Sequence, residues 1–337
     1  MKHKSLISSM AQPCRARLLL AGLAAVAGMA SAAGAAPAAT YPTRPIRFVA
    51  PTSPGGANDL LPRILGARMT QNWGQQVVVD IRPGAGGIVG TEIAARAAPD
   101  GYTLLIVANG YALNPFLNAK LPYDTVKDFD RVSLFTTAPL VLVVPNQSPS
   151  QTVQELINTA KAKPGMLNYA TSGLGSGGWL SIELLKKLAN LKMTHIPYKG
   201  AGQATAAVLG NEVNMLFTSP LAAAPYIKSG RIRALAVTSP KRVPSMENVP
   251  AMNEIIPGYE VLNFFGILVP AGTPKSIITK LNTEINRITA LPDVKDQFAA
   301  LGFEPVHYTP EQFTAFLKAE MSKWSAIIKE AGIKAEG

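Results

Sequence analysis

The residues that could do chemistry in this chain lie in three glycine-rich segments, residues 54–56, 83–87 and 173–178. Each follows a predicted strand and precedes a predicted helix. Glycine lets the backbone turn sharply and approach a ligand, and the first N–H groups of a helix carry about half a positive charge. The pattern therefore predicts capture of an anion by main-chain N–H groups, helped by the hydroxyls of Ser53, Ser172 and Ser176. The alternative is that these glycines only make tight turns.

The third segment also matches the dinucleotide-binding pattern G-x-G-x-x-G, through Gly173, Gly175 and Gly178. That pattern requires an acidic residue about twenty positions further on, at the end of the next strand, where it would bind a ribose. Here the next strand ends in residues 195–199 (HIPYK), which contain no carboxylate. A dinucleotide site is therefore not expected.

No arrangement of residues for catalysis stands out. Ser172 and Ser176 could act as nucleophiles, but neither lies in G-x-S-x-G. The candidate bases are His195 in a predicted strand and His307 in a predicted edge strand, and both are more simply structural. Asp59 suits the first turn of a helix because the helix dipole favours an acid there. We predict no catalytic residue, with an exported hydrolase of small esters or amides as the alternative.

The first forty residues have the features of a secretory signal peptide. They contain four basic residues and no acidic one, and the apolar stretch 18–29 is too short to span a bilayer. Ala30-Ser31-Ala32 then provides the small residues of a cleavage site. We predict a signal peptide over residues 1–32, or to about residue 40, and a periplasmic mature protein. A membrane anchor is the alternative.

Removing this segment changes how the composition is interpreted. The 337-residue chain has a net charge of +11 and one cysteine, Cys14, which leaves with the signal peptide. Without the four basic residues the charge is +7, and Lys186-Lys187 and Lys241-Arg242 are isolated pairs. We expect no nucleic-acid binding. With no thiol and two histidines left, neither a metal site nor a cofactor is expected.

The elements that would position the turns alternate between strand and helix. Strands are predicted at 46–50, 77–81 and 102–108, with helices between them, which is typical of a parallel sheet covered by helices. A second unit of this kind begins near residue 140. Capping signals predict further helices after Thr152, Thr273 and Thr309. The fold class is therefore α/β.

Two apolar strands end alike in Val-Pro, at residues 141–145 and 266–270. If they lie side by side, they are two crossings of the chain between lobes. This predicts one lobe from residues 41–139 plus 264–337 and a second from residues 140–263.

Several motifs along the mature chain together resemble one family, the tripartite tricarboxylate transporter receptors, also called the Bug (Bordetella uptake gene) family. The motifs are, in order, residues 41–47 (YPTRPIR), 54–59 (PGGAND), 82–87 (RPGAGG), 99–104 (PDGYTL), 195–200 (HIPYKG), 233–238 (RALAVT) and 270–274 (PAGTP). The resemblance covers nearly all of the mature chain.

The resemblance implies a two-lobed periplasmic binding protein of type II, the Venus-flytrap fold, with parallel-rich mixed sheets. It further implies a monomer that captures a small carboxylate between its lobes and delivers it to inner-membrane permease subunits. Carried over by position, the ligand-binding residues would be Ser53, Pro54, Gly55, Gly56, Asp59, Asn109, Tyr111, Ala112, Ser172, Gly175, Ser176, Lys199, Thr218 and Ser219.

Two departures from the family pattern bear on the ligand. Trp179 stands where the family commonly has histidine, and Thr218 where it has an acid or an amide. The loss of an acid disfavours ligands with an amino group, whereas Trp179 could form an apolar wall of the site. We therefore expect an aromatic or dicarboxylic acid, with packing of Trp179 in the core as the alternative.

Overall fold

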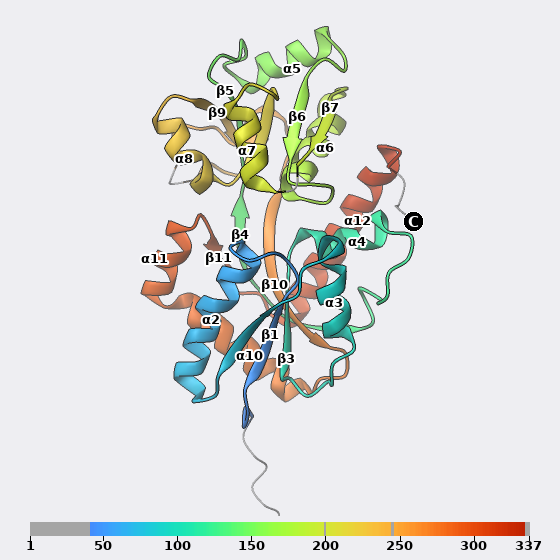
Figure 1. Cartoon of the computed structure of the whole chain (residues 1–337), viewed down its shortest axis with the longest axis vertical. Helices are drawn as coiled ribbons and strands as arrows, with labels where there is room; N and C mark the ends of the chain where they lie inside the picture. The colour runs from blue at the N-terminus through green and yellow to red at the C-terminus, as the bar shows by residue number, and fades with distance from the viewer. Residues whose placement is uncertain (1–40, 199, 244–245, 334–337) are drawn as a thin grey trace, which may run out of the picture. The chain divides into compact units, whose positions relative to one another are not determined.

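The computed structural model describes residues 41–198, 200–243 and 246–333. Residues from Arg44 onward form one compact unit, which contains two β-sheets with helices against them (Figure 1). Among the described residues, no helix is long and apolar enough to cross a membrane. The predicted signal peptide lies outside the described residues.

The first sheet has six strands in the order β11-β4-β10-β3-β1-β2. Strand β1 is parallel to its neighbours β2 and β3, whereas β10 runs antiparallel to both β3 and β4. The strands are β1 (Ile46–Ala50), β2 (Val77–Ile81), β3 (Thr103–Val107), β4 (Phe129–Pro139), β10 (Leu262–Pro270) and β11 (Glu304–Pro305).

The second sheet has five strands in the order β7-β6-β8-β5-β9. Here β6 is parallel to β7 and β8, and β5 is antiparallel to β8 and β9. The strands are β5 (Val141–Pro145), β6 (Asn168–Thr171), β7 (Thr194–Pro197), β8 (Met215–Thr218) and β9 (Ile232–Val237).

The helices begin and end largely where local sequence signals predict. Thr152 accepts the N–H of Glu155 at 3.1 Å, and Thr309 accepts that of Gln312 at 3.2 Å, which confirms two of the three predicted caps. Thr273 does not cap its helix, because α10 begins one residue later, after Pro274, and the Thr273 hydroxyl donates to the Pro270 carbonyl at 2.7 Å. The helices are α2 (Ala57–Trp73), the 3-10 turn η1 (Ala85–Gly87), α3 (Ile88–Ala95), α4 (Asn109–Leu117), α5 (Val153–Ala162), α6 (Gly177–Ala189), α7 (Ala201–Leu209), α8 (Pro220–Lys228), α9 (Met252–Ile255), α10 (Lys275–Ala290), α11 (Pro292–Ala300) and α12 (Pro310–Glu330).

The predicted pairing of residues 141–145 with 266–270 is wrong. The first segment is β5 of the five-stranded sheet, and the second belongs to β10 of the six-stranded sheet. Strand β10 instead pairs with β4, where Leu262 faces Pro139 and Phe265 faces Thr136. A shared Val-Pro ending carries no information about strand register, because register depends on which backbones meet in space. The chain passes between the sheets at Leu140, between β4 and β5.

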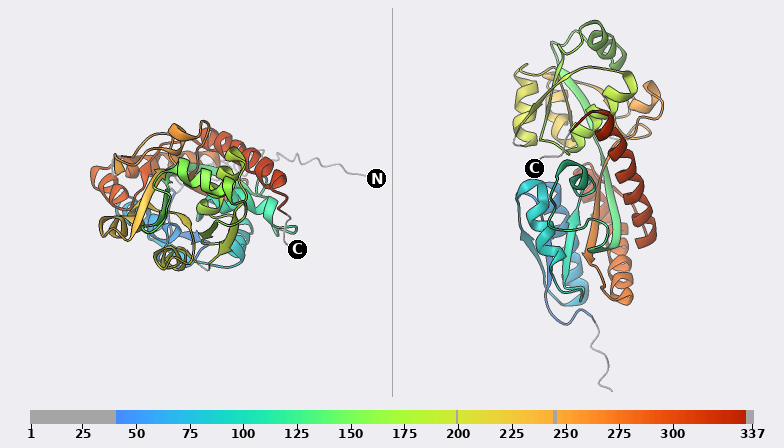
Figure 2. Two further views of the ribbon diagram at one scale, coloured as in Figure 1. Left: turned by 90° about the horizontal axis from the view of Figure 1, so that it is seen from above. Right: turned by 90° about the vertical axis from the view of Figure 1, so that its right-hand side faces the viewer.

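Helix α12 packs on both halves of this fold. Phe313 and Leu317 belong to a buried cluster with β3, β4 and β10 side chains. Further along the same helix, Trp324 and Ile328 belong to a cluster with α6 and β8 side chains. In the right-hand view of Figure 2, α12 is the dark red helix that runs past both sheets. The helix therefore joins the two sheets in addition to the strand crossings.

Candidate functional site

The first glycine-rich turn joins β1 to α2 and is open to solvent. Ser53, Pro54, Gly55 and Gly56 are all exposed, and Gly55 has a positive φ of 84°. Helix α2 begins after Gly56, and no side chain caps it. The Asp59 N–H donates to the Gly56 carbonyl at 2.9 Å, which leaves the N–H groups of Ala57 and Asn58 for solvent or an anion.

The Asp59 carboxylate, a predicted ligand contact, points into the first turn and not toward solvent. The carboxylate is buried, accepts the Gly55 N–H at 3.0 Å, and pairs with Arg63 at 2.6 Å. The hydrogen bond from Gly55 lowers the pKa of the Asp59 carboxyl, and Arg63 lowers it further. The carboxylate closes the turn from within, and it occupies the Gly55 N–H that the sequence analysis assigned to a ligand.

Asn58, which the sequence analysis did not single out, is a further candidate in this turn. Its side chain is 8% exposed, and its Oδ1 is one of the buried side-chain atoms without a hydrogen-bond partner among the described residues. Leaving a buried acceptor unpaired costs about 1–3 kcal/mol, so this atom suits a contact to a ligand or a water. Its position at the start of an uncapped helix is the sequence signal that could have identified it.

The second turn lies directly against the first. A Cβ added to Gly90 of α3 would come within 2.8 Å of Pro51 Cα and 2.7 Å of the Arg82 carbonyl. Only glycine allows helix α3 to approach both backbones this closely. The structure thus brings the beginnings of the first two turns together.

Residues 109–112, predicted as a ligand-binding loop, are instead the start of helix α4. The Asn109 side chain is buried and binds strand β10, donating to the Leu262 carbonyl at 3.0 Å and accepting the Phe264 N–H at 3.2 Å. Tyr111 is 5% exposed and donates its hydroxyl to the Thr125 carbonyl at 2.7 Å. Burial raises the pKa of the Tyr111 hydroxyl. Ala112 is also buried, so these side chains hold the fold rather than face a ligand.

The third turn packs against this same helix. Gly175 is buried, and a Cβ added to it would lie 3.2 Å from Leu117 Cδ1 and 3.7 Å from Leu113 Cδ1. The second turn approaches α4 as well, since a Cβ added to Gly86 would lie 4.0 Å from Asn114 Oδ1. The second and third turns therefore both approach α4, although more than eighty residues separate them in the chain, and the end of β1 before the first turn lies against the second.

Within the third turn the two serines differ in their surroundings. Ser172 is exposed. Ser176 caps α6, because its Oγ accepts the Trp179 N–H at 3.3 Å and donates to the Gly173 carbonyl at 2.8 Å. Its hydroxyl is engaged within the turn, so Ser172 is the serine free to reach a ligand.

Strand β8 ends close to the third turn. A Cβ added to Gly178 would lie 2.9 Å from the Phe217 carbonyl, which places the first turn of α6 against the end of β8. Thr218 there is buried, and Ser219 precedes α8 without capping it through its side chain. Lys199, the remaining predicted contact, lies outside the described residues.

Trp179 packs in the core, which corrects its prediction as a wall of the site. The side chain is 2% exposed and belongs to the buried cluster that includes Leu180 and Phe217. Helix α6 turns this face toward the sheet, where burying an aromatic ring stabilises the fold. The structure therefore supports the alternative, in which Trp179 packs in the core.

Among the described residues, the positive electrostatics of the site come from helix ends rather than from unpaired side-chain cations. Helices α2, α4, α7 and α8 all begin without a side-chain cap. The nearby basic residues Arg63 and Arg82 are paired with Asp59 and Asp80. Uncapped helix starts attract an anion through N–H groups and the helix dipole, so the arrangement suits a carboxylate.

The candidate residues for catalysis are not brought together. His195 Nε2 lies 2.7 Å from Thr171 Oγ1, and His307 Nδ1 lies 3.2 Å from Thr289 Oγ1. Neither contact is a serine–histidine pair. Among the described residues, no group of three or more histidine, aspartate or glutamate side chains is arranged to hold a metal ion.

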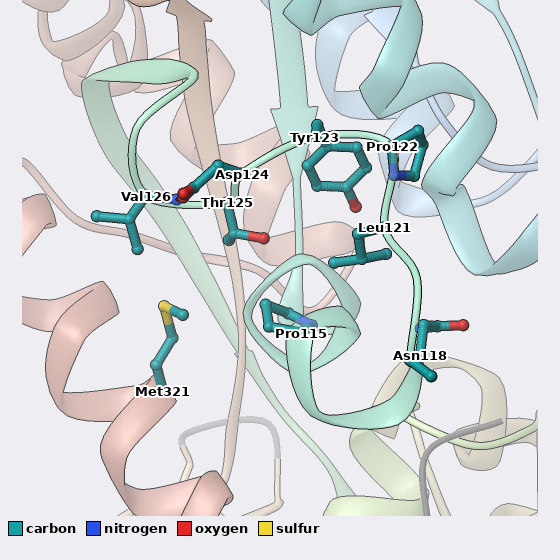
Figure 3. Close-up of a pocket in the computed structure, with 10 residues that line it drawn as sticks. Pro115, Asn118, Leu121, Pro122, Tyr123, Asp124, Thr125, Val126 and Met321 are labelled. Carbon is teal, nitrogen blue, oxygen red and sulfur yellow. The ribbon is translucent and has the colours of Figure 1, made fainter. Parts of the chain in front are cut away.

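Two cavities lie beside these elements and share none of the predicted site residues. One, of about 630 Å³, is formed by residues 118–119 and 121–126, Pro115 and Met321 of α12 (Figure 3). The other cavity has a volume of about 740 Å³. Its lining includes Pro220 and Arg242, from the part of the chain with the five-stranded sheet, and Phe303 and His307, from the part with the six-stranded sheet. Neither of these two cavities is lined by the glycine-rich turns.

Comparison with known proteins identifies the family. The model of the tripartite tricarboxylate transporter family receptor matches residues 61–333. The chain belongs to this family. The predicted membership in the Bug group is confirmed by its relatives, which include Protein BugT of Bordetella pertussis, 36% identical over 86% of this chain and 90% of that protein. A UPF0065 protein from the tcbD–tcbE intergenic region of Pseudomonas sp. strain P51 is 39% identical over 87% of this chain and 88% of the relative.

Solved structures of similar receptors confirm the two-lobed fold. Rpa4515 of R. palustris, solved with adipate, is 32% identical with a TM-score of 0.79, and covers 88% of this chain and 100% of its own. The periplasmic binding protein BugD is 31% identical with a TM-score of 0.76, over 88% and 100% of the two chains. MatC (Rpa3494) of Rhodopseudomonas palustris, with bound malate, is 30% identical with a TM-score of 0.74, over 86% and 100%. This receptor's fold is therefore that of a two-lobed periplasmic binding protein.

Proposed function

We propose that this receptor binds a small dicarboxylate at the three glycine-rich turns and delivers it to the membrane subunits of a tripartite tricarboxylate-type transporter. The observation that carries the proposal is that the second and third turns both approach α4, with the first turn beside the second and with helices α2 and α4 beginning without a side-chain cap. Adipate and malate, bound by two similar receptors, are both dicarboxylates without an amino group. Thr218, in place of an acid, also disfavours an amino group.

The ligand contacts that we propose are side chains and main-chain groups at or beside these turns. They are Ser53, the N–H groups of Gly56 and the α2 start, Asn58, Ser172, Gly175 and Ser219, with Lys199 added from the family pattern. A charge-assisted hydrogen bond contributes about 1.5–3 kcal/mol. About four of them, less the cost of association, suit an affinity near micromolar. Because Trp179 is buried, it no longer supports the expectation of an aromatic ligand. The binding test therefore includes an aromatic acid for comparison.

We further propose that the lobes comprise residues 41–139 plus 264–337 and residues 140–263. The strands support this division, since those of the six-stranded sheet fall within 46–139 and 262–305, and those of the other within 141–237. Two-lobed receptors close around a ligand, and release requires that closure be reversible. We also propose that the protein is a periplasmic, non-catalytic monomer whose signal peptide is cleaved. The intact mass of the exported protein would test cleavage after Ala32.

A thermal-shift and calorimetry panel tests the ligand class. Adipate, malate, citrate, terephthalate and glutamate are compared on the wild-type protein and on Ser172→Glu, which adds a negative charge to the exposed third turn. Ser322→Glu, at an exposed position of α12, is the matched control. We expect a dicarboxylate to stabilise the wild type and the control, and binding to Ser172→Glu to weaken at least tenfold. Stabilisation by none of these acids would overturn the proposal.

The alternative, an exported hydrolase, predicts a change in the small molecule. Mass spectrometry of adipate, malate and their methyl esters after incubation separates the two functions. Unchanged compounds support the receptor, and ester cleavage that is lost in Ser172→Ala supports the hydrolase.

A further inference from the structure

His195 lies on β7 beside the strand that leads into the third turn. Strand β7 runs parallel to β6, with His195 opposite Tyr169. The two rings are stacked, with centroids 5.1 Å apart and an angle of 21° between their planes. His195 Nε2 is 2.7 Å from the hydroxyl oxygen of Thr171, the last residue of β6. The histidine is thus held by its neighbours in one orientation.

Thr171 connects this histidine to the turn. Its side chain is fully buried, and its Oγ1 accepts the Gly173 N–H at 3.1 Å and donates to the Gly173 carbonyl at 3.3 Å. The same carbonyl accepts the hydroxyl of Ser176, the residue that caps α6. A continuous set of hydrogen bonds therefore runs from His195 through Thr171 and Gly173 to the start of α6.

The proton on Nε2 decides how Thr171 can use its own single hydroxyl proton. If Nε2 carries a proton, it donates to Thr171 Oγ1, and the threonine proton is free for the Gly173 carbonyl. If Nε2 is unprotonated, Thr171 donates to the ring and leaves that carbonyl to Ser176 alone. Doubly protonated histidine allows only the first arrangement. In that arrangement Thr171 Oγ1 both accepts the Gly173 N–H and donates to the Gly173 carbonyl.

Three titratable side chains on neighbouring elements face this histidine. On the packed elements β6 and α6, the groups facing it are Tyr169, Glu183 and Lys186. Tyr169 donates to Glu183 at 2.8 Å, and Lys186 binds both Glu183 oxygens at 2.9 Å. Burial lowers the pKa of His195, Glu183 raises it, and Lys186 lowers it. The ring is therefore neutral at neutral pH, and it gains a proton only as pH falls below the ordinary histidine pKa of about 6.5.

We propose that His195 is a positioning residue for the third turn, whose protonation fixes the Thr171 hydroxyl on Gly173 and tightens carboxylate binding there. The ligand part rests on the proposed function, whereas the link from His195 to Gly173 does not. Because one proton is taken up on binding, affinity rises as pH falls through the His195 pKa, by at most about tenfold per pH unit.

The first experiment needs no ligand. NMR follows the His195 ring and the Gly173 amide nitrogen from about pH 8 to about pH 5. We expect the Gly173 signal to titrate with the His195 midpoint in the wild type and in His307→Gln, a control at the other described histidine. Thr171→Val, which keeps the shape and removes the hydroxyl, should abolish this inflection. A Gly173 amide that does not follow His195, or a His195 that does not titrate, overturns the proposal.

The second experiment uses adipate and malate as probes. The Kd of each is measured at about pH 5 and pH 7.5 for the wild type, His195→Gln and His307→Gln. Glutamine keeps a donor toward Thr171 at every pH, so His195→Gln should bind with a pH-independent Kd once the shared titration of the probe is subtracted. The wild type and His307→Gln should bind about three- to tenfold more tightly at the lower pH. Equal pH dependence in all three proteins overturns the proposal, whereas absence of binding in all three counts against the proposed function and leaves the NMR result to decide the link.

Discussion

The carboxylate of Asp59 accepts the backbone N–H of Gly55 at 3.0 Å, so an acid inside α2 closes the turn that precedes it. Replacing this residue by alanine should lower the free energy of unfolding by about 2 kcal/mol at neutral pH, because a buried charge-assisted hydrogen bond is lost. The Asp59 pKa is lower in the folded protein than in the unfolded chain. Its stabilisation is therefore complete above the unfolded pKa of about 4 and is lost as pH falls through the folded value. Urea denaturation at neutral and acidic pH measures both effects.

The control for Asp59→Ala is Glu92→Ala, which breaks a pair with Arg96 of the same i,i+4 spacing but at the surface. That change should cost less than about 0.5 kcal/mol. Equal losses in the two variants would contradict the role assigned to Asp59.

Gly90 should not tolerate a side chain. In Gly90→Ala the new Cβ would lie within 2.8 Å of the Pro51 and Arg82 backbones, and we expect a loss of about 1–3 kcal/mol. Gly202→Ala in α7 is the matched control, since nothing lies within 4 Å of its added Cβ and alanine favours a helix by about 1 kcal/mol. Denaturation midpoints should thus move in opposite directions, and a stable Gly90→Ala protein would refute the close packing of the first two turns.

Trp179 should affect stability rather than ligand choice. Trp179→Ala removes a buried ring and should lower the free energy of unfolding by about 3–5 kcal/mol. Leu174→Ala, in the exposed part of the third turn, should cost less than about 0.5 kcal/mol. The milder Trp179→Phe variant should keep the wild-type order of affinities across the acid panel. A changed order with unchanged stability would restore Trp179 to the ligand site.

The exposed ion pair between Arg242 and Glu254 should lower the pKa measured for the Glu254 carboxyl. The Arg242 side chain donates to the Glu254 carboxylate at 2.7 Å, and the pKa of that carboxyl is about 2. In Arg242→Gln the Glu254 pKa should rise toward its ordinary value of about 4.3. Carbon-detected NMR between about pH 2 and pH 6 measures it, with Glu92 as an internal reference. An unchanged Glu254 midpoint would show that the pair does not form in solution.

Local signals predicted most of the elements because each depends on a few neighbouring residues. The caps at Thr152 and Thr309 and the left-handed Gly74 after α2 act within one helical turn. The sequence does not predict helix α4, because Pro115 interrupts its pattern, nor strand β4, because residues 129–139 do not alternate between apolar and polar side chains.

The sequence by itself determined the family, the α/β class and the three glycine-rich turns, because these follow from short motifs and their order. Only the tertiary structure decided that Trp179 and Tyr111 are buried, that Asn109 binds β10, and that Asp59 closes its own turn. Side chains such as tryptophan, tyrosine and asparagine occur both in cores and in ligand sites, and the local sequence does not distinguish the two. Which of the two it joins depends on residues far away in the chain that meet it when the sheets and helices pack.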